Sequence, residues 1–189
     1  MKLELFYPVK PYKLIQSFGL NPDYYKFLGI IGHNGEDLVA SRNQIVRAAH
    51  DGLITFTGQD GSGGWGVVIR TEDERDDFQG IKSYWKTIYW HLLPNIPIKA
   101  GQKVKVGDVI GYADSTGFST NDHLHFGLKP IAQGEADWQW ENIYQNNGFK
   151  GAVNPYNYWN KYYAEDAQRV LAIYQNIIQL LKNFLFKKL

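Results

Sequence analysis

In the segment Asp122-His123-Leu124-His125-Phe126-Gly127-Leu128, apolar residues alternate with residues of other kinds from His123 onward. In an extended chain its three large apolar side chains lie on one face, and His123 and His125 lie on the other. The alternation therefore predicts a strand that packs one face against a hydrophobic core. Two imidazoles on the open face can both reach one point above the sheet, as ligands of a metal ion would. A pair of surface histidines on an exposed strand gives the same pattern, so this motif alone leaves both interpretations open.

Further strands are predicted before this segment, from short β-branched and aromatic runs separated by glycines. They span Gln44–Ala48, Gly52–Thr57, Gly66–Arg70, Lys86–His91, Lys103–Val106 and Val109–Asp114. No helical pattern lies between them, which favours antiparallel sheets and hairpins over βαβ units. The predicted fold class of this part of the chain is therefore mainly β.

Three other segments are interpreted from their composition. The acidic stretch Thr71–Gly80 is predicted to form the solvated tip of a long hairpin. The run Gly61–Gly66 matches a dinucleotide-binding fingerprint, but a strand follows it where that fingerprint needs a helix, so a hairpin turn is predicted. Trp138 and Trp140 alternate in an extended segment, where core and edge packing is preferred over a role as the rim of a groove.

The C-terminal segment from about Lys161 to Lys188 has no glycine or proline, and its apolar residues recur at helical spacing. One long amphipathic helix is predicted, acidic in its first turns and basic at its end, as the helix dipole favours. The chain is accordingly divided into a β domain at 1–160 and a helix at 161–189. Three roles stay open for the helix: packing on the core, self-association and contact with a membrane surface. Packing is favoured, on the sheet or on a second copy, because the polar face carries few cations.

The composition excludes several kinds of site. The 189 residues carry 20 Lys and Arg against 19 Asp and Glu, with no cysteine. The scattered, balanced charges offer no basic stripe, so no nucleic-acid partner is expected. Without cysteine, any metal must be held by His and carboxylate. The chain has no run of about 18 apolar residues, so no transmembrane segment is expected. Its start has no apolar signal-peptide core, which leaves the route of export open.

A second pair of candidate metal ligands precedes the β segments. In His33-Asn34-Gly35-Glu36-Asp37, an imidazole and a carboxylate are four residues apart. The nearby glycines argue against a helix, so a loop entering a short strand at Asp37–Ala40 is predicted, with Gly35 letting the backbone fold His33 over Asp37. These are ligand types that Zn²⁺ accepts in a site without cysteine. A loop histidine beside a surface carboxylate is the alternative.

The remaining histidines carry weaker signals. His91 is predicted to share a strand face with Tyr89, opposite Ile88, Trp90 and Leu92. A lone histidine on a strand usually has a structural role. His50 precedes an Asp-Gly turn and is interpreted as structural.

The order of these motifs is more specific than any one of them. H-x-G-x-D ends at Asp37, Y-x-H-L spans Tyr89–Leu92, G-Q-x-V-x-x-G-x-x-I-G spans Gly101–Gly111, and S-T-G-x-S-T-x-x-H-L-H-F spans Ser115–Phe126. Together they resemble the lysostaphin-type (LytM-like) zinc metallopeptidases, which cut peptidoglycan cross-links. The resemblance covers about Leu14–Tyr158, and the C-terminal helix lies outside it.

The resemblance implies that His33, Asp37 and His125 bind one zinc ion per chain, and that His91 and His123 are unliganded catalytic histidines. Three protein ligands leave a fourth tetrahedral position for water, which is typical of a catalytic zinc site. His91 and His123 are the candidates for proton transfer or for stabilising the oxyanion, and the sequence does not divide these roles. Glu36 replaces a residue that is apolar in many relatives, and could tune the metal or the groove.

The expected function is a zinc endopeptidase that hydrolyses peptide cross-links of peptidoglycan, in cell-wall lysis or remodelling. Its place of action would be the bacterial cell wall, extracellular or periplasmic. The absence of a signal peptide suits a phage-type lysin or a mature fragment. The alternative is a non-catalytic LytM-like module that binds or activates a cell-wall partner, but such relatives usually lack some ligands.

Overall fold

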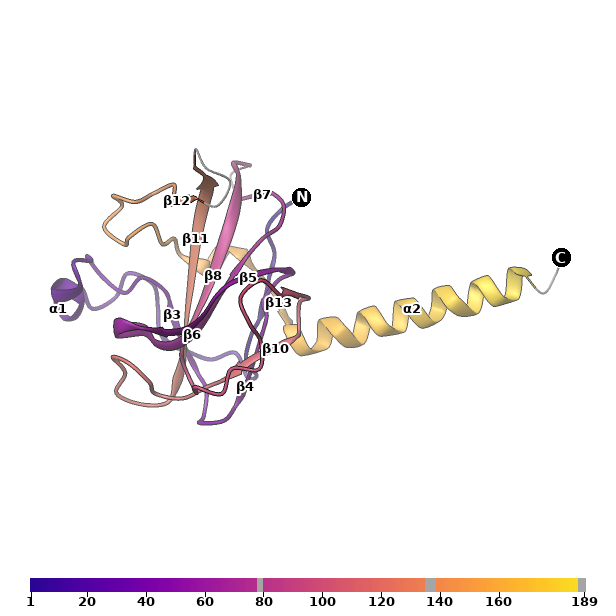
Figure 1. Cartoon of the computed structure of the whole chain (residues 1–189), viewed down its shortest axis with the longest axis horizontal. Coiled ribbons are helices and arrows are strands. Elements are labelled where there is room, and N and C mark those ends of the chain that lie inside the picture. The colour runs from indigo at the N-terminus through magenta and orange to yellow at the C-terminus, as the bar shows by residue number, and fades with distance from the viewer. Residues whose placement is uncertain (78–79, 135–138, 187–189) are drawn as a thin grey trace.

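A computed structural model describes residues 1–77, 80–134 and 139–186 of the chain (Figure 1). Within them, a nine-stranded sheet carries the two long strands β8 (Lys82–Leu92) and β11 (His123–Gln133) side by side at its centre. The strand order is β2 (Leu14–Gln16), β3 (Glu36–Val39), β11, β8, β6 (Gly64–Arg70), β5 (Gly52–Asp60) and β9 (Lys103–Val104). β12 (Trp140–Asn142) also pairs with β11, and β7 (Arg75–Asp76) with β8. Every pairing in this sheet is antiparallel, as predicted.

Two smaller pairs of strands complete the body. β10 (Val109–Tyr112) pairs antiparallel with β4 (Ile45–Arg47). β1 (Leu5–Tyr7) pairs parallel with β13 (Trp159–Tyr163), which joins the two ends of the β region. The helical turns in this region are short: α1 (Pro22–Tyr25) and the 3₁₀ turns Lys26–Leu28, Gly61–Gly63 and Pro155–Tyr158.

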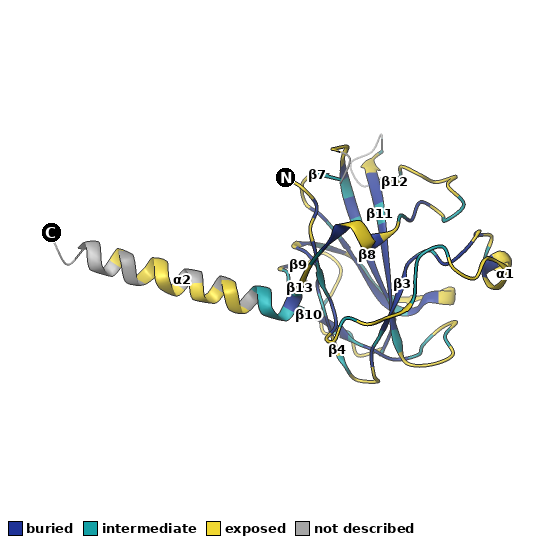
Figure 2. Cartoon of the chain, turned by 180° about the vertical axis from the view of Figure 1, so that it is seen from behind, coloured by how far each residue is buried: buried dark blue, intermediate teal, exposed yellow. Residues whose placement is uncertain are grey.

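The hydrophobic core lies against one face of the large sheet, and the central strands β8 and β11 are buried along most of their length (Figure 2). Leu124, Phe126 and Leu128 of β11 are fully buried, as their spacing predicted. The ring of Phe126 contacts Tyr89 of β8 at 5.3 Å and Trp159 of β13 at 4.8 Å between centroids. The opposite face of the same strands is left to carry polar side chains, and that face holds the histidines.

All eight strands predicted from sequence, including the short one at Asp37–Ala40, are present, with shifted ends. In the run Gly61–Gly66, residues Gly61–Gly63 make a 3₁₀ turn between β5 and β6 and the rest begins β6, which confirms a hairpin turn. The acidic stretch joins β6 to β8 and includes β7, while residues 78–79 lie outside the described part. Trp140 lies in β12, whereas Trp138 is not among the described residues.

The C-terminal segment follows the sheet region as α2 (Ala164–Phe186), which projects away from the body (Figures 1 and 2). The predicted helical start at Lys161 is wrong, because residues up to Tyr163 belong to β13. On α2, Val170, Ile173 and Ile177 are about half exposed, so this part of the helix does not pack on the sheet. No helix in the described part of the chain combines the length and the hydropathy needed to cross a membrane.

Candidate active site

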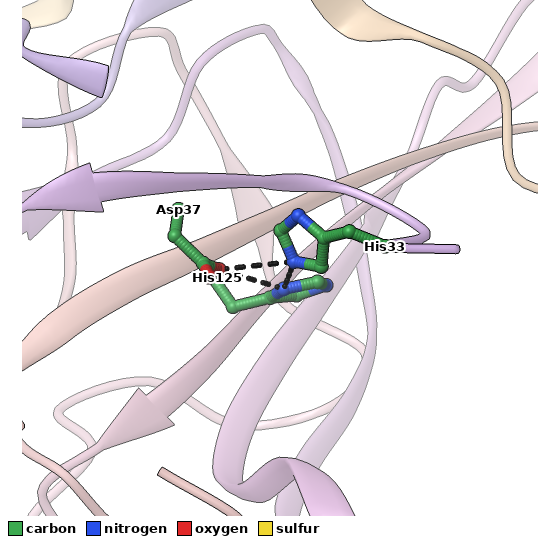
Figure 3. A group of neighbouring side chains, drawn as sticks. All are labelled: His33, Asp37 and His125. Atoms are coloured by element: carbon green, nitrogen blue, oxygen red, sulfur yellow. Dashed lines mark hydrogen bonds and ion pairs between the residues drawn. The ribbon is translucent and has the colours of Figure 1, made fainter. Parts of the chain in front are cut away.

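Three polar side chains from distant parts of the sequence converge on the open face of the sheet (Figure 3). His33 Nε2 lies 3.0 Å from His125 Nδ1, and both nitrogens lie 3.1 Å from Asp37 Oδ1. The pairing of β3 with β11 sets His125 directly opposite Asp37, and the loop before β3 supplies His33. The structure therefore brings together the three residues predicted as metal ligands.

The loop that presents His33 is held by its backbone. His33 N–H donates to Leu20 O at 2.9 Å, and His33 O accepts from Gly19 N–H at 2.8 Å. Gly35 lies so close to His125 that a Cβ on Gly35 would meet the imidazole at 2.6 Å. A glycine is thus required here because of close approach, and the predicted fold of the loop over Asp37 is confirmed.

The donor set fits a zinc ion. Tetrahedral zinc with bonds of about 2.0–2.1 Å separates its ligand atoms by roughly 3.3 Å, close to the spacings of this triad. His33 Nδ1–H donates to Ser17 O at 3.3 Å, which leaves Nε2 with its lone pair directed at the other two ligands. His33, Asp37 and His125 are all buried, at 1%, 8% and 9% exposure, so a bound cation would be largely shielded from bulk water.

The electrostatics of the triad centre on Asp37. Burial alone would raise the pKa of Asp37, but its contacts with the imidazoles of His123, His125 and His33 outweigh burial and lower this pKa. Burial lowers the pKa of His125 against the opposing effect of Asp37. An ionised carboxylate beside neutral imidazoles is the protonation state that a divalent metal requires.

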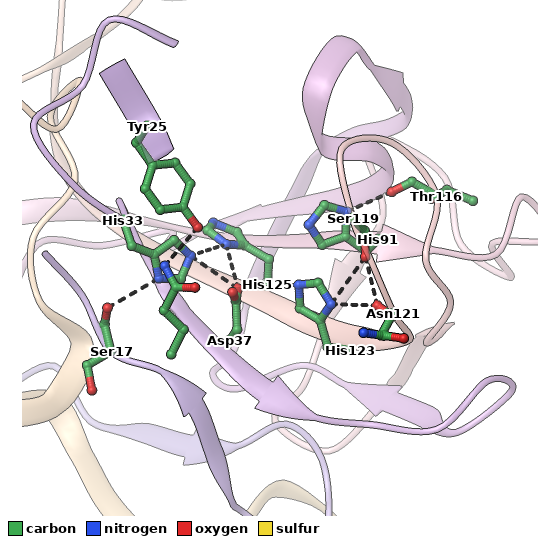
Figure 4. Close-up of polar contacts among 11 residues, drawn as sticks. Ser17, Tyr25, His33, Asp37, His91, Thr116, Ser119, Asn121, His123 and His125 are labelled. Atoms are coloured by element: carbon green, nitrogen blue, oxygen red, sulfur yellow. Dashed lines mark hydrogen bonds and ion pairs between the residues drawn. The ribbon is translucent and has the colours of Figure 1, made fainter. Parts of the chain in front are cut away.

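His91 and His123 lie beside the triad, with their ring centroids 4.6 Å apart (Figure 4). His123 Nε2 is 3.5 Å from Asp37 Oδ1, and the His91 ring centroid is 6.0 Å from that of His125. All four histidines named by the family resemblance therefore face one pocket.

The predicted orientation of His91 is wrong in one respect. Tyr89 points into the core, while His91 faces the site, so the two residues do not share a strand face. The reason is the backbone of His91, whose φ of 63° interrupts the alternation of the strand. Trp90 and His91 consequently both lie on the open side, and Leu92 returns to the core.

Backbone carbonyls fix both of these imidazoles. His91 Nδ1–H donates to Thr116 O at 2.7 Å, and His123 Nδ1–H donates to Asn121 O at 2.8 Å. In the neutral rings, Nε2 is therefore the basic nitrogen in each case. Burial, then the charge of His125, lowers the pKa of His91 to about 4. For His123, burial would lower the pKa, but the hydrogen bond and the charge of Asp37 raise it.

The four histidines open onto a cavity of about 380 Å³. Sequence reasoning missed Tyr25, which lines this cavity and stacks on His33 with ring centroids 5.3 Å apart. Tyr25 accepts a hydrogen bond from Gln16 Nε2 at 2.9 Å, and burial, then the charge of Asp37, raises the Tyr25 pKa to about 12. Tyr25 lies in α1, outside the sequence motifs that contain the histidines, so those motifs gave no signal for it.

Two other residues have structural roles. Glu36 points away from the cavity: its Oε2 accepts hydrogen bonds from Trp159 Nε1 at 2.9 Å and from Tyr12 O–H at 3.1 Å. Glu36 therefore does not line the cavity of the histidines, and the suggestion that it tunes the metal or the groove by direct contact is wrong. His50 is buried between Thr87 Oγ1 at 2.9 Å and Asp51 O at 2.8 Å, in keeping with its structural interpretation.

Comparison with known proteins agrees with this geometry. The model of peptidase family M23 matches residues 31–137. The chain is 38% identical over 101 residues to the glycyl-glycine endopeptidase ALE-1 of Staphylococcus capitis, covering 52% of this chain and 25% of that relative. It is 39% identical over 94 residues to the DD-carboxypeptidase/endopeptidase Mpg of Neisseria meningitidis, covering 50% of this chain and 19% of that relative.

The fold is also that of a solved relative. The catalytic domain of lysostaphin from Staphylococcus simulans superposes with a TM-score of 0.54 at 26% identity, covering 77% of this chain and 90% of that domain. The chain matches only a quarter or less of the length of the two curated relatives. Since the family match spans more than half of the 189 residues and contains the triad, the chain belongs to peptidase family M23, the lysostaphin-type zinc metallopeptidases.

Proposed function

We propose that the chain is a zinc endopeptidase that hydrolyses peptide cross-links of bacterial peptidoglycan. One observation carries this proposal: His33, Asp37 and His125 converge in a buried triad, and two further imidazoles face the same cavity. A module that only binds zinc has no use for His91 and His123. The relatives' names, a glycyl-glycine endopeptidase and a DD-carboxypeptidase/endopeptidase, support peptidoglycan as the substrate class.

In this proposal His33, Asp37 and His125 hold one zinc ion. When bound, zinc would supply a Lewis acid for the scissile carbonyl and lower the pKa of an attacking water. His91 and His123 present their Nε2 atoms to the cavity, since each Nδ1 is bound to a carbonyl. These nitrogens can take a proton from water and return it to the leaving amine. Tyr25 borders the cavity and offers a hydroxyl to the substrate.

The catalytic unit is proposed to be the β region, at about 1–160, and its place of action the cell wall. Both a lysin that opens the wall and an enzyme that remodels it fit the same site. Adding the purified protein to intact cells and to purified walls separates these two roles. A lysin clears intact cells from outside as well as purified walls.

The test of the function is zinc content together with peptide release from purified peptidoglycan, measured for the full chain. His125→Ala is expected to lose both zinc and hydrolysis, because it removes a ligand. His91→Ala is expected to keep zinc and lose hydrolysis. Glu4→Gln, an exposed change, is the matched control and should behave as wild type. If the wild type holds zinc and hydrolyses no type of peptidoglycan, the chain is a non-catalytic binding module.

A further inference from the structure

Three cations lie in one row across the open face of the sheet, beyond the histidine site. Arg70 of β6 is paired with Lys86 of β8, and Lys86 is paired with Lys129 of β11. Their strand neighbours on the other face, among them Ile69 and Leu128, are buried in the core. Arg70, Lys86 and Lys129 therefore project to the same side as His125. We call these three residues the cationic row.

The cationic row is unfavourable as it stands. Like charges opposite each other on neighbouring strands repel, and all three side chains are partly buried. Burial lowers the pKa of Lys86. Burial, and next the charge of Lys86, lowers the pKa of Lys129 to about 8. This arrangement of like charges does not stabilise the fold unless an anion offsets their repulsion.

Within the described residues, no carboxylate forms an ion pair with Arg70, Lys86 or Lys129. Arg70 stacks on the ring of Trp140 at 3.9 Å, and its buried Nε has no hydrogen-bond partner in the part of the chain that the structure describes. Among the described residues, Lys129 Nζ donates to one carbonyl oxygen, Lys150 O, at 2.7 Å. Asp60 is exposed nearby and its charge favours protonated Lys129, but the two make no ion pair. The row therefore has unused capacity for a ligand.

The cationic row is continuous with the active site. Lys86, Lys129 and the side chains between them line a cavity of about 230 Å³. Asp60 and Trp90 line both this cavity and the cavity of the histidines. Along β11, Lys129 lies four residues from His125, which is about 13 Å of extended strand. A short extended peptide with its scissile bond at the triad can reach this far.

We propose that the cationic row binds a free carboxylate of the substrate, so that the enzyme prefers cross-links in acidic stem peptides over neutral glycine bridges. The ammonium groups of Lys86 and Lys129, which line this cavity, can form charge-assisted hydrogen bonds with a carboxylate, and Arg70 at the end of the row adds positive charge. A neutral bridge offers no negative charge to this row. This inference rests on the proposed peptidoglycan endopeptidase function and specifies its substrate class.

The experiment compares two synthetic cross-linked peptides that differ only in one group, a free carboxylate or its carboxamide. With the zinc-loaded full chain, kcat/KM should be about 10- to 100-fold higher for the acid, the range expected for one charge-assisted interaction. Lys86→Met and Lys129→Met should reduce this preference mainly through KM and leave the carboxamide peptide unaffected. Lys99→Met, which removes an exposed lysine outside this cavity, is the matched control.

Two readouts separate this inference from the proposed function. Calorimetry measures the affinity of the wild-type protein for the acid peptide and for the carboxamide peptide. Comparing the two affinities tests the cationic row even if no bond is cut, and it needs no variant. Equal binding and equal turnover of acid and carboxamide overturn the role of the cationic row. Preferential binding of the acid with no hydrolysis supports the row and refutes the endopeptidase function.

Discussion

Gly35 lies directly against His125, and a Cβ built on Gly35 would come within 2.6 Å of the His125 Cε1 atom. The same Cβ would meet Phe126 O at 2.6 Å, so backbone and imidazole together leave no room for a side chain. This contact links the loop that carries His33 to the strand that carries His125. The geometry of the triad therefore depends on a residue that binds no metal itself.

Gly35→Ala is expected to weaken zinc binding by about 10- to 100-fold, the size of effect found when the supports of metal ligands are lost. The methyl group must displace the His125 ring or push β3 away from β11. Competition with a chromogenic chelator measures the zinc affinity, and thermal unfolding of the metal-free protein measures any general loss of stability. Wild-type zinc affinity in a folded Gly35→Ala protein would contradict the close packing described here.

Zinc removal is expected to destabilise the folded chain. An ion that binds only the native state stabilises it by about 4 kcal/mol at a concentration 1,000 times its Kd. Chelation should therefore lower the Tm, and added zinc should restore it. His33→Ala, which removes one ligand of the triad, should show a Tm that barely responds to zinc. A wild-type Tm that is insensitive to both chelator and zinc would argue against metal binding by this triad.

Much of this site was predictable because its residues follow local rules. Period-two alternation identified the strand of His123 and His125, and the glycines around His33 predicted a loop instead of a helix. The orientation of His91 was not predictable, because a φ of 63° at that one residue reverses the expected face. The carbonyls that hold His91 and His123 belong to Thr116 and Asn121, and any residue type supplies a carbonyl.

The C-terminal boundary of the β region shows another limit of local patterns. Residues up to Tyr163 continue as a strand because β1, more than 150 positions earlier in the chain, supplies hydrogen-bonding partners: Leu5 pairs with Trp159, and Tyr7 with Tyr163. Helical spacing in the sequence predicted a helix from Lys161 onward. A long-range pairing outweighs a local preference here. The cationic row is likewise invisible in sequence, since Arg70, Lys86 and Lys129 meet only through strand register.

Glu36→Ala is expected to reduce the free energy of unfolding by about 3 kcal/mol without changing zinc affinity. It would leave the partly buried Tyr12 O–H and the buried Trp159 Nε1–H without their acceptor, at about 1–3 kcal/mol for each group. Urea denaturation measures the first effect and chelator competition the second. Glu36→Gln, which keeps one oxygen acceptor, should lose less. Weaker zinc binding in a stable Glu36→Gln protein would restore a role for Glu36 at the metal.

His50 is expected to make the fold less stable in mild acid. Burial lowers its folded-state pKa to about 4, against about 6.5 in an unfolded chain. The unfolded state therefore binds a proton first as the pH falls, and stability is lost between about pH 6.5 and pH 4. The loss amounts to about 3 kcal/mol for this group. The stabilising contribution is fully present above pH 6.5.

His50→Gln should flatten the pH dependence of stability relative to wild type. Urea denaturation at pH 7 and pH 5, with chelator present, isolates the contribution of His50 from metal binding. Other buried histidines, such as His91, titrate in both proteins and cancel in the comparison. Identical pH slopes for the two proteins would mean that His50 takes up its proton equally in the folded and unfolded states.

The junction between β13 and α2 predicts where the chain can be shortened. Ala164 is fully buried, and Lys10 lies 3.7 Å from both Glu165 and Asp166. Beyond this point the described apolar side chains Ile173 and Ile177 are exposed. Truncation after Asp166 keeps Ala164 and both contacts of Lys10, and should therefore keep the wild-type Tm and the rate of hydrolysis of soluble muropeptides.

Truncation after Asn160 is the informative comparison, because it removes the end of β13 together with Ala164 and leaves Tyr7 without its partner residue Tyr163. This shorter protein should melt several degrees lower than the one that ends at Asp166, even though both lack the exposed part of α2. A lower Tm in both truncated proteins would instead show that α2 stabilises the β region. Unchanged muropeptide hydrolysis combined with slower digestion of whole walls, in the protein ending at Asp166, would assign α2 to recruitment of the enzyme and not to catalysis.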